Sequence, residues 1–251
     1  MTEDAPVLGV SATAETPDRE QLGTVIEAAG AVPCAVDSPA ELPEDLAAIV
    51  TVGPSALRAI ARWQPAVPVL PVGVDCGLPS VPRADLAAAV EAIVANDATE
   101  HEAPMLEVAV DDEVYATAFR EVTMITAEPA RISEFAIEHE RAGPLDTVRA
   151  DGVVIATPAG SYTYAAAGDG PLLEPGTGLA IVPVAPFRTD RDRWVVPHER
   201  VSVCVQRDEA DVTVEADGAV LTTVGRDVEV SLTPAGKLGV LVVEESVRDP
   251  R

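Results

Sequence analysis

The chain has 251 residues, of which 47% are hydrophobic, and its 42 acidic against 17 basic side chains give a formal charge of −25. The hydrophobic fraction excludes wholesale disorder, and the acidity excludes nucleic-acid binding through a basic face. Molar salt, which shortens the Debye length to about 3 Å, would screen the repulsion among so many acids. We therefore expect a cytoplasmic protein from a salt-accumulating, haloarchaeal organism, with an ordinary acidic protein as the alternative.

The first hundred residues alternate short apolar runs with segments in which apolar residues recur at helical spacing. The predicted strands are 6–10, 31–36, 46–52 and 67–74, and the predicted helices are 18–30, 55–63 and 82–97. Strands that alternate with helices in this way form a parallel sheet covered by the helices. The sequence therefore predicts an α/β domain over residues 1–100.

Helical spacing nearly disappears after residue 100, and short segments rich in Val, Ile and Thr follow one another between turn residues. The predicted strands are 105–112, 113–126, 130–139, 152–157, 178–185, 200–206, 210–218, 227–233 and 238–245. This pattern predicts an all-β domain, a β-sandwich, over residues 101–251. Its C-terminal tail is a candidate to return to the first domain, and a ligand cleft between the domains is the default expectation.

Several other site classes have no support in the sequence. Cys34, Cys76 and Cys204 form no CxxC pair, so neither a zinc site nor a disulfide framework is predicted. The three histidines are scattered, and we predict no metal site. The N-terminus lacks the basic and apolar regions of a signal peptide, and no apolar run reaches the length of a membrane span.

Residues 156–176, ATPAGSYTYAAAGDGPLLEPG, directly follow the predicted strand GVVIA. Their glycines would serve either a close approach to a ligand or ordinary turns. The motif RADG precedes this stretch, TPAGSYTY and GDGP lie within it, and VEADG follows at 214–218. The order and spacing of these motifs resemble the NAD kinase family over roughly residues 105–243. The resemblance implies the family's two-domain fold and NAD or NADP as ligand. The implied activity is 2′-phosphorylation of NAD by ATP or polyphosphate with Mg²⁺.

The first domain resembles the family less closely. The segment GVDCG at 73–77 stands at the family's G-I-N-x-G, with Asp75 in place of asparagine. The family's G-G-D-G-T should follow the strand LAAIV, but this chain has TVGPSA there. In the family, the aspartate of that motif lies by the ribose hydroxyl that is phosphorylated. We therefore leave the catalytic residue unknown, with Asp75 as the one nearby carboxylate that could substitute.

A second departure concerns the family's N-E pair, which contacts the adenosine ribose. Here Arg120 and Glu121 stand at those positions. Arginine offers a planar, positively charged fork that suits phosphate, so we hypothesise that the site tolerates or prefers NADP over NAD. The alternative is that Arg120 pairs with Glu121, Glu107 or another surface acid.

The resemblance also implies further ligand-binding residues, each with a structural alternative. Asp151 would face the nicotinamide half of the ligand, or make an ordinary Asp-Gly turn. The tyrosine Tyr164 would pack against a base, or belong to the core, and Tyr162 could crowd the adenine pocket. Asp217 is expected in a hairpin turn and at most lines the ligand cleft of a neighbouring subunit. The remaining predicted binding residues, all in the glycine-rich stretch, are Thr157, Gly160, Ser161 and Thr163.

Two functions remain open at the level of sequence, with a purely structural β-rich subunit as a third. The first is an NAD kinase, with NAD as substrate and ATP and Mg²⁺ as further requirements. The second is a non-catalytic protein that binds NAD(H) or NADP(H) as a regulator, because the loss of G-G-D-G-T removes a group needed for turnover. The resemblance also implies a homo-oligomer assembled through the β domain, and we expect neither nucleic acid nor membrane as a partner.

Overall fold

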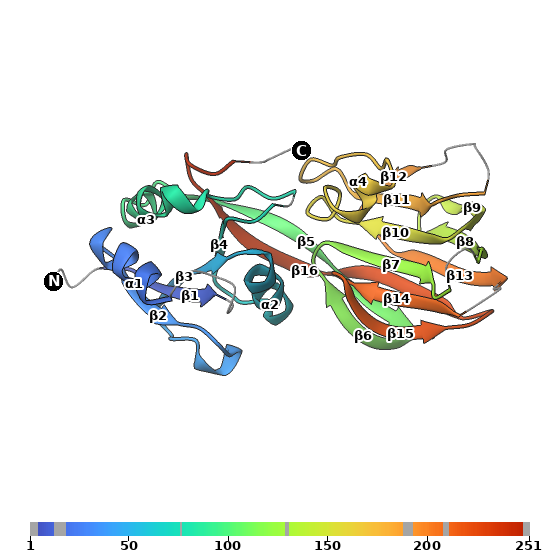
Figure 1. The fold of residues 1–251 in the computed structure, drawn as a ribbon, viewed down its shortest axis with the longest axis horizontal. Coiled ribbons are helices and arrows are strands. Elements are labelled where there is room, and N and C mark those ends of the chain that lie inside the picture. Colours follow the sequence, from blue (N-terminus) through green and yellow to red (C-terminus); the bar gives the residue numbers. More distant parts are fainter. Residues whose placement is uncertain are drawn as a thin grey trace. The chain divides into compact units, whose positions relative to one another are not determined.

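The computed structural model describes residues 5–12, 19–75, 77–128, 131–187, 193–207 and 211–247 (Figure 1). The chain divides into two compact units. One contains the residues up to Ala103 together with those from Lys237, and the other is Pro104–Gly236. Of the three cysteines, Cys34 and Cys204 are free thiols whose pKa values are raised by burial, and Cys76 lies outside the described residues.

The first unit is α/β, as the alternation of elements predicts. Its parallel strands lie in the order β2-β1-β3-β4, because each helical segment returns the chain to the same end of the sheet. The strands are β1 (Val7–Ala12), β2 (Val32–Ala35), β3 (Leu46–Val52) and β4 (Val69–Val72). The helices are α1 (Arg19–Ala28), α2 (Pro54–Trp63) and α3 (Leu86–Val94), with 3-10 turns η1 (Pro39–Glu41) and η2 (Arg83–Asp85).

The second unit consists almost entirely of antiparallel strands. One of its sheets has the order β12-β11-β10-β7-β14-β15, and the other contains β16, β13, β8 and β9 in that order, with β5 paired to both β16 and β6. The first sheet's strands are β7 (Glu121–Thr126), β10 (Gly152–Ala156), β11 (Leu179–Val184), β12 (Trp194–Val196), β14 (Val212–Ala216) and β15 (Ala219–Val224). The others are β5 (Thr99–Val110), β6 (Glu113–Ala118), β8 (Ser133–His139), β9 (Gly143–Ala150), β13 (Val201–Arg207) and β16 (Glu229–Val242). The predicted fold class, a parallel α/β part followed by an all-β part, is confirmed.

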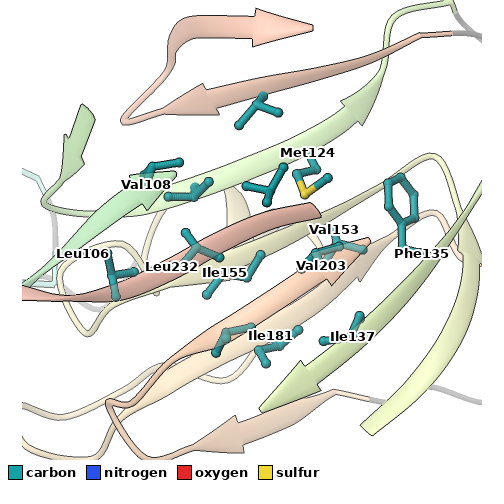
Figure 2. Close-up of a cluster of buried hydrophobic side chains, with 14 of the residues drawn as sticks. Leu106, Val108, Met124, Phe135, Ile137, Val153, Ile155, Ile181, Val203 and Leu232 are labelled. Carbon is teal, nitrogen blue, oxygen red and sulfur yellow. The ribbon is translucent and has the colours of Figure 1, made fainter. Parts of the chain in front are cut away.

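The core of the second unit lies between these sheets, and Figure 2 shows its side chains. Met124, Val153 and Ile181 come from one sheet, and Phe135 and Val203 from the other. Strands β8, β13 and β14 bury alternate residues, as expected when one face of a sheet packs on a core. Every residue of β10 is buried, so both of its faces are covered.

The second face of β10 is covered by the glycine-rich stretch itself. A small apolar cluster joins Val154 and Ala156 of β10 and Ala180 and Val182 of β11 with Ala165 and Leu173 of that stretch. Ala165 belongs to a short helix, α4 (Tyr164–Ala167), that sequence periodicity did not indicate. The stretch is therefore packed onto the sheet, and this packing fixes the place of residues 157–164.

Two strand predictions are wrong: the strands predicted at 227–233 and 238–245 form the single strand β16, and residues 113–126 do not form one strand. Residues 113–126 were expected to form a single strand, but the structure breaks it into β6 and β7 at Phe119 and Arg120. The two pieces lie in different sheets. The physical reason is a side chain distant in sequence, Asp217, which holds the backbone at the break. The described residues contain no helix long and apolar enough to cross a membrane.

Candidate functional site

The break between β6 and β7 is held by a buried carboxylate. Asp217 accepts hydrogen bonds from the backbone N–H groups of Phe119 at 2.9 Å, Arg120 at 2.7 Å and Glu121 at 3.1 Å. Asp217 lies in the turn between β14 and β15 with φ of 52°, a left-handed conformation that aspartate tolerates better than most residues. The predicted hairpin turn at Asp217 is therefore present, and its side chain also fixes the Phe119–Glu121 turn.

The glycine-rich loop after β10 contacts the same turn. The Thr157 N–H donates to the Arg120 carbonyl oxygen at 2.8 Å, and the Thr157 hydroxyl lies 2.9 Å from the Phe119 carbonyl oxygen and 3.0 Å from that of Arg120. A Cβ atom at Gly160 would lie 2.1 Å from the Arg120 carbonyl oxygen. Gly160 therefore permits a close approach of two backbone segments, so that residues 120–121 and 157–164 form one site.

Ser161 is fully buried inside this loop. Its hydroxyl donates to the Pro158 carbonyl oxygen at 2.9 Å and accepts from the Leu173 N–H at 2.9 Å. Both hydrogen-bonding functions of the hydroxyl are thus used within the protein. Ser161 shapes the loop, and direct contact with a ligand through Gly160 or Ser161 stays a prediction.

The carboxylate of Glu121 is the central polar group of the site. Glu121 is 5% exposed and accepts from the Thr163 hydroxyl at 2.7 Å and the Tyr164 N–H at 3.2 Å. Burial raises the pKa of Glu121, although Thr163, the Arg120 charge and the Tyr164 N–H act in the opposite direction. The Thr163 hydroxyl oxygen also lies 2.7 Å from the Gly160 carbonyl oxygen. Because a hydroxyl has one proton, Thr163 can donate to only one of these two oxygens at a time.

Arg120 differs from the residues around it. Its Nε atom is buried without a hydrogen-bond partner, and none of the ion pairs formed by the described residues includes its guanidinium group. Neither Glu121 nor Glu107 forms such a pair with it in the described part of the chain. The side chain of Arg120 is therefore a positive group with unused donors beside the Glu121 carboxylate.

The remaining predicted residues are divided between two places. Tyr164, 39% exposed, and the half-buried Tyr162 lie beside Thr163 on the loop. Asp151 precedes β10 whereas Thr157 follows it, so the two are separated by about 20 Å of extended strand. At its end of the strand, Asp151 is held by backbone hydrogen bonds to Val184 and Thr126. The structure does not bring Asp151 together with the other predicted residues within one chain.

The first unit holds the loop that replaces G-G-D-G-T. Gly53, with φ of 86°, follows β3, and Pro54 begins α2. No carboxylate stands between residues 51 and 56, and Asp75 is exposed on the loop after β4. The Arg83 side chain lies over the loop at Gly53 and the loop at Gly73. A Cβ atom added to Gly53 would lie 3.6 Å from the Arg83 Nη2 atom, and one added to Gly73 would lie 2.8 Å from the Arg83 Nε atom. Nothing in the sequence indicates this position for Arg83, because the prediction places it in the first turn of a helix at 82–97.

The described residues contain no group of three His, Cys, Asp or Glu side chains that could hold a metal ion.

Sequence reasoning also missed the carboxylate of Asp217 as the group that fixes Arg120 and Glu121. The only available signal was the Asp-Gly pair at the end of a predicted strand, which indicates a turn and says nothing of its partner.

Comparison with known proteins shows similarity over most of the chain. Residues 119–241 match the family described as the ATP-NAD kinase C-terminal domain. The NAD kinases of Methanosarcina mazei and Methanosarcina acetivorans are 32% and 33% identical over 183 and 178 residues. These alignments cover 70% and 68% of this chain but 62% and 63% of the relatives, so the chain spans less than two thirds of their length.

Two solved structures share the fold. Yeast NADH kinase complexed with NADH superposes with a TM-score of 0.79 at 15% identity and covers 97% of this chain and 85% of its own. The NAD kinase from Archaeoglobus fulgidus in complex with ATP gives 0.73 at 20% identity, with 96% and 95% covered.

Proposed function

Because the chain belongs to the NAD kinase family, we propose that it binds NAD or NADP at the site formed by the Phe119–Glu121 turn and the loop 157–164. One observation carries this proposal. The two segments in which the family resemblance places ligand contacts are separate in sequence, and the hydrogen bonds of Thr157, Thr163 and Tyr164 join them in the second unit.

The chemistry of this site suits a dinucleotide. A carboxylate such as Glu121 accepts hydrogen bonds from ribose hydroxyls, and the exposed Tyr164 ring offers a face on which a base can stack. The guanidinium group of Arg120 can bind a phosphate oxygen. These three groups match the three kinds of chemistry in the ligand, namely hydroxyls, aromatic rings and phosphates.

We further propose that transfer of a phosphoryl group to NAD is weak or lost in this chain. A positioned general base contributes about 10²–10⁴-fold to the rate, and the loop at residues 51–56 has no side chain that could act as one. Asp75 is the candidate to replace it. ATP would bring Mg²⁺, and we assign that ion no protein ligands. If turnover is lost, the protein is a regulator or partner subunit that binds NAD(H) or NADP(H).

The test is NADP formation from NAD, ATP and Mg²⁺ in molar potassium chloride. A rate no higher than the protein-free blank, together with measurable NAD or NADP binding, is the expected result for a non-catalytic protein. A rate typical of NAD kinases would contradict the proposal of weak or lost activity. Any residual rate should fall by about 10²–10⁴-fold in Asp75→Asn if Asp75 is the base. The Asp85→Asn variant, which changes an exposed acid of the same unit, should keep that rate.

A cytoplasmic, high-salt setting and a homo-oligomer belong to the same proposal. The charge of −25 supports the high-salt setting, because repulsion among acids is screened at high ionic strength. Light scattering would test the homo-oligomer, and thermal unfolding across a potassium chloride series would test the high-salt setting. We expect a mass above that of one chain and a melting temperature that rises with salt.

A further inference from the structure

Arg120 is an unusual arginine for this chain. Acids outnumber bases 42 to 17, and several other arginines in the described residues form ion pairs, such as Arg19 with Asp37 at 2.6 Å and Arg200 with Glu229 at 2.7 Å. Arg120 has no such pair, and its Nε is buried without a hydrogen bond. Buried polar groups are nearly always hydrogen-bonded, since leaving one unpaired is unfavourable.

The backbone beneath Arg120 is held from both sides. Its N–H donates to Asp217, and its carbonyl oxygen accepts from the Thr157 N–H. Gly160 packs against the same peptide. The Cα position is therefore fixed while the guanidinium donors stay unused. This combination is expected for a binding group that is positioned in advance, because less ordering is then needed when the ligand binds.

We propose that Arg120 binds the 2′-phosphate of NADP(H), so that the site prefers the phosphorylated dinucleotide over NAD(H). This inference rests on the proposed dinucleotide site. A guanidinium group donates two parallel hydrogen bonds to a phosphate, a geometry that an asparagine or a lysine does not reproduce. NADP differs from NAD only by this phosphate, so a residue that contacts it changes the affinity for one ligand alone.

The neighbouring Glu121 must be considered in the charge balance. An ionised carboxylate repels a phosphate, and a protonated one does not. The Glu121 side chain is buried and accepts from the Thr163 hydroxyl and the Tyr164 N–H, so its oxygens face the loop. Asp217 is also close, but its oxygens accept three backbone N–H groups and face the turn. Arg120 is then the charged side chain of the turn that keeps donors for an incoming phosphate.

Calorimetric titration of the full chain with NAD and with NADP tests this inference. Both titrations use the same potassium chloride concentration, in the molar range. Wild type is expected to bind NADP more tightly than NAD. Arg120→Gln should weaken NADP binding by about 10- to 100-fold and leave NAD binding within about twofold. Arg120→Lys should recover only part of the loss. Arg226→Gln makes the same charge change at an exposed turn of the second unit and should alter neither affinity.

The outcomes separate the two proposals. If wild type binds neither dinucleotide, the proposed function itself is overturned. If both bind but NADP is not preferred, the inference fails and the site stands. If Arg120→Gln weakens NAD and NADP equally, Arg120 contacts the pyrophosphate that both share, which also overturns the inference. An unchanged unfolding midpoint for Arg120→Gln would show that any loss of binding is not a loss of folding.

Discussion

Two loops of this molecule, one in each unit, stand where the NAD kinase family has a motif. They differ in how closely they resemble that motif and in what holds them in place. After β10, residues 157–164 differ from the family's motif at several positions, yet side-chain and backbone hydrogen bonds fix them to the Phe119–Glu121 turn. After β3, residues 51–56 keep a glycine at the turn but carry no acid, and α2 begins without a side-chain cap. The comparison contrasts a loop that hydrogen bonds hold in place with a loop that has no side chain able to act as a general base.

The largest expected effect comes from Gly160→Ala, which changes the loop after β10. The added Cβ atom would overlap the Arg120 carbonyl oxygen, 2.1 Å away, and backbone cannot yield as a flexible side chain can. We expect a loss of about 3 kcal/mol in the free energy of unfolding, the upper end for overpacking. Denaturant unfolding in potassium chloride measures it. Gly23→Ala in helix α1, whose Cβ atom would meet Pro33 at an ordinary 3.7 Å, should be neutral or stabilising. Equal effects for the two variants would contradict this explanation.

Asp217→Asn should have the next largest effect. The amide keeps one acceptor oxygen and the tolerance for a left-handed backbone, but it loses a charge-assisted acceptor for the N–H groups of residues 119–121. We expect a loss of about 2 kcal/mol in the free energy of unfolding. Asp227→Asn is the matched control, since Asp227 also has positive φ but is exposed, and its effect should stay within about 0.5 kcal/mol. A stable Asp217→Asn variant with an unchanged site would show that the carboxylate does not hold the turn.

The smallest effect is a pH dependence from Glu121. Its pKa in the folded chain is raised above the ordinary value of about 4.3, so between these values the folded state binds more protons than the unfolded state. Stability from this group is therefore present at low pH and is lost as pH rises through the folded pKa. The glutamine in Glu121→Gln cannot titrate. The unfolding free energy of this variant should therefore increase relative to that of wild type as pH rises. Parallel pH dependences for the two proteins would contradict the raised pKa.

The sequence predicts much of the fold because period and composition act locally. The helical spacing of Leu22 and Ile26 and the buried run of β3 suffice to indicate the α/β part. The break at Phe119 and Arg120 could not be predicted, because the alternating residues 113–126 favour one continuous strand. The group that breaks it, Asp217, is 98 residues away from Phe119.

The residues of the candidate site could be predicted from the sequence, but their individual roles could not. The motifs identify residues 120–121 and 157–164, but not which of them face a ligand. Gly160 is required by its close contact with the Arg120 backbone, and the Ser161 hydroxyl makes two hydrogen bonds within the protein. The unpaired state of Arg120 and the place of Arg83 depend on tertiary contacts that have no local sequence signal.

A crystal structure of the chain with NADP, grown at high potassium chloride, tests the binding site most directly. We expect the dinucleotide to lie against the Phe119–Glu121 turn, with its 2′-phosphate within hydrogen-bond distance of the Arg120 guanidinium group. NADP bound away from residues 120–121 and 157–164 would contradict the account.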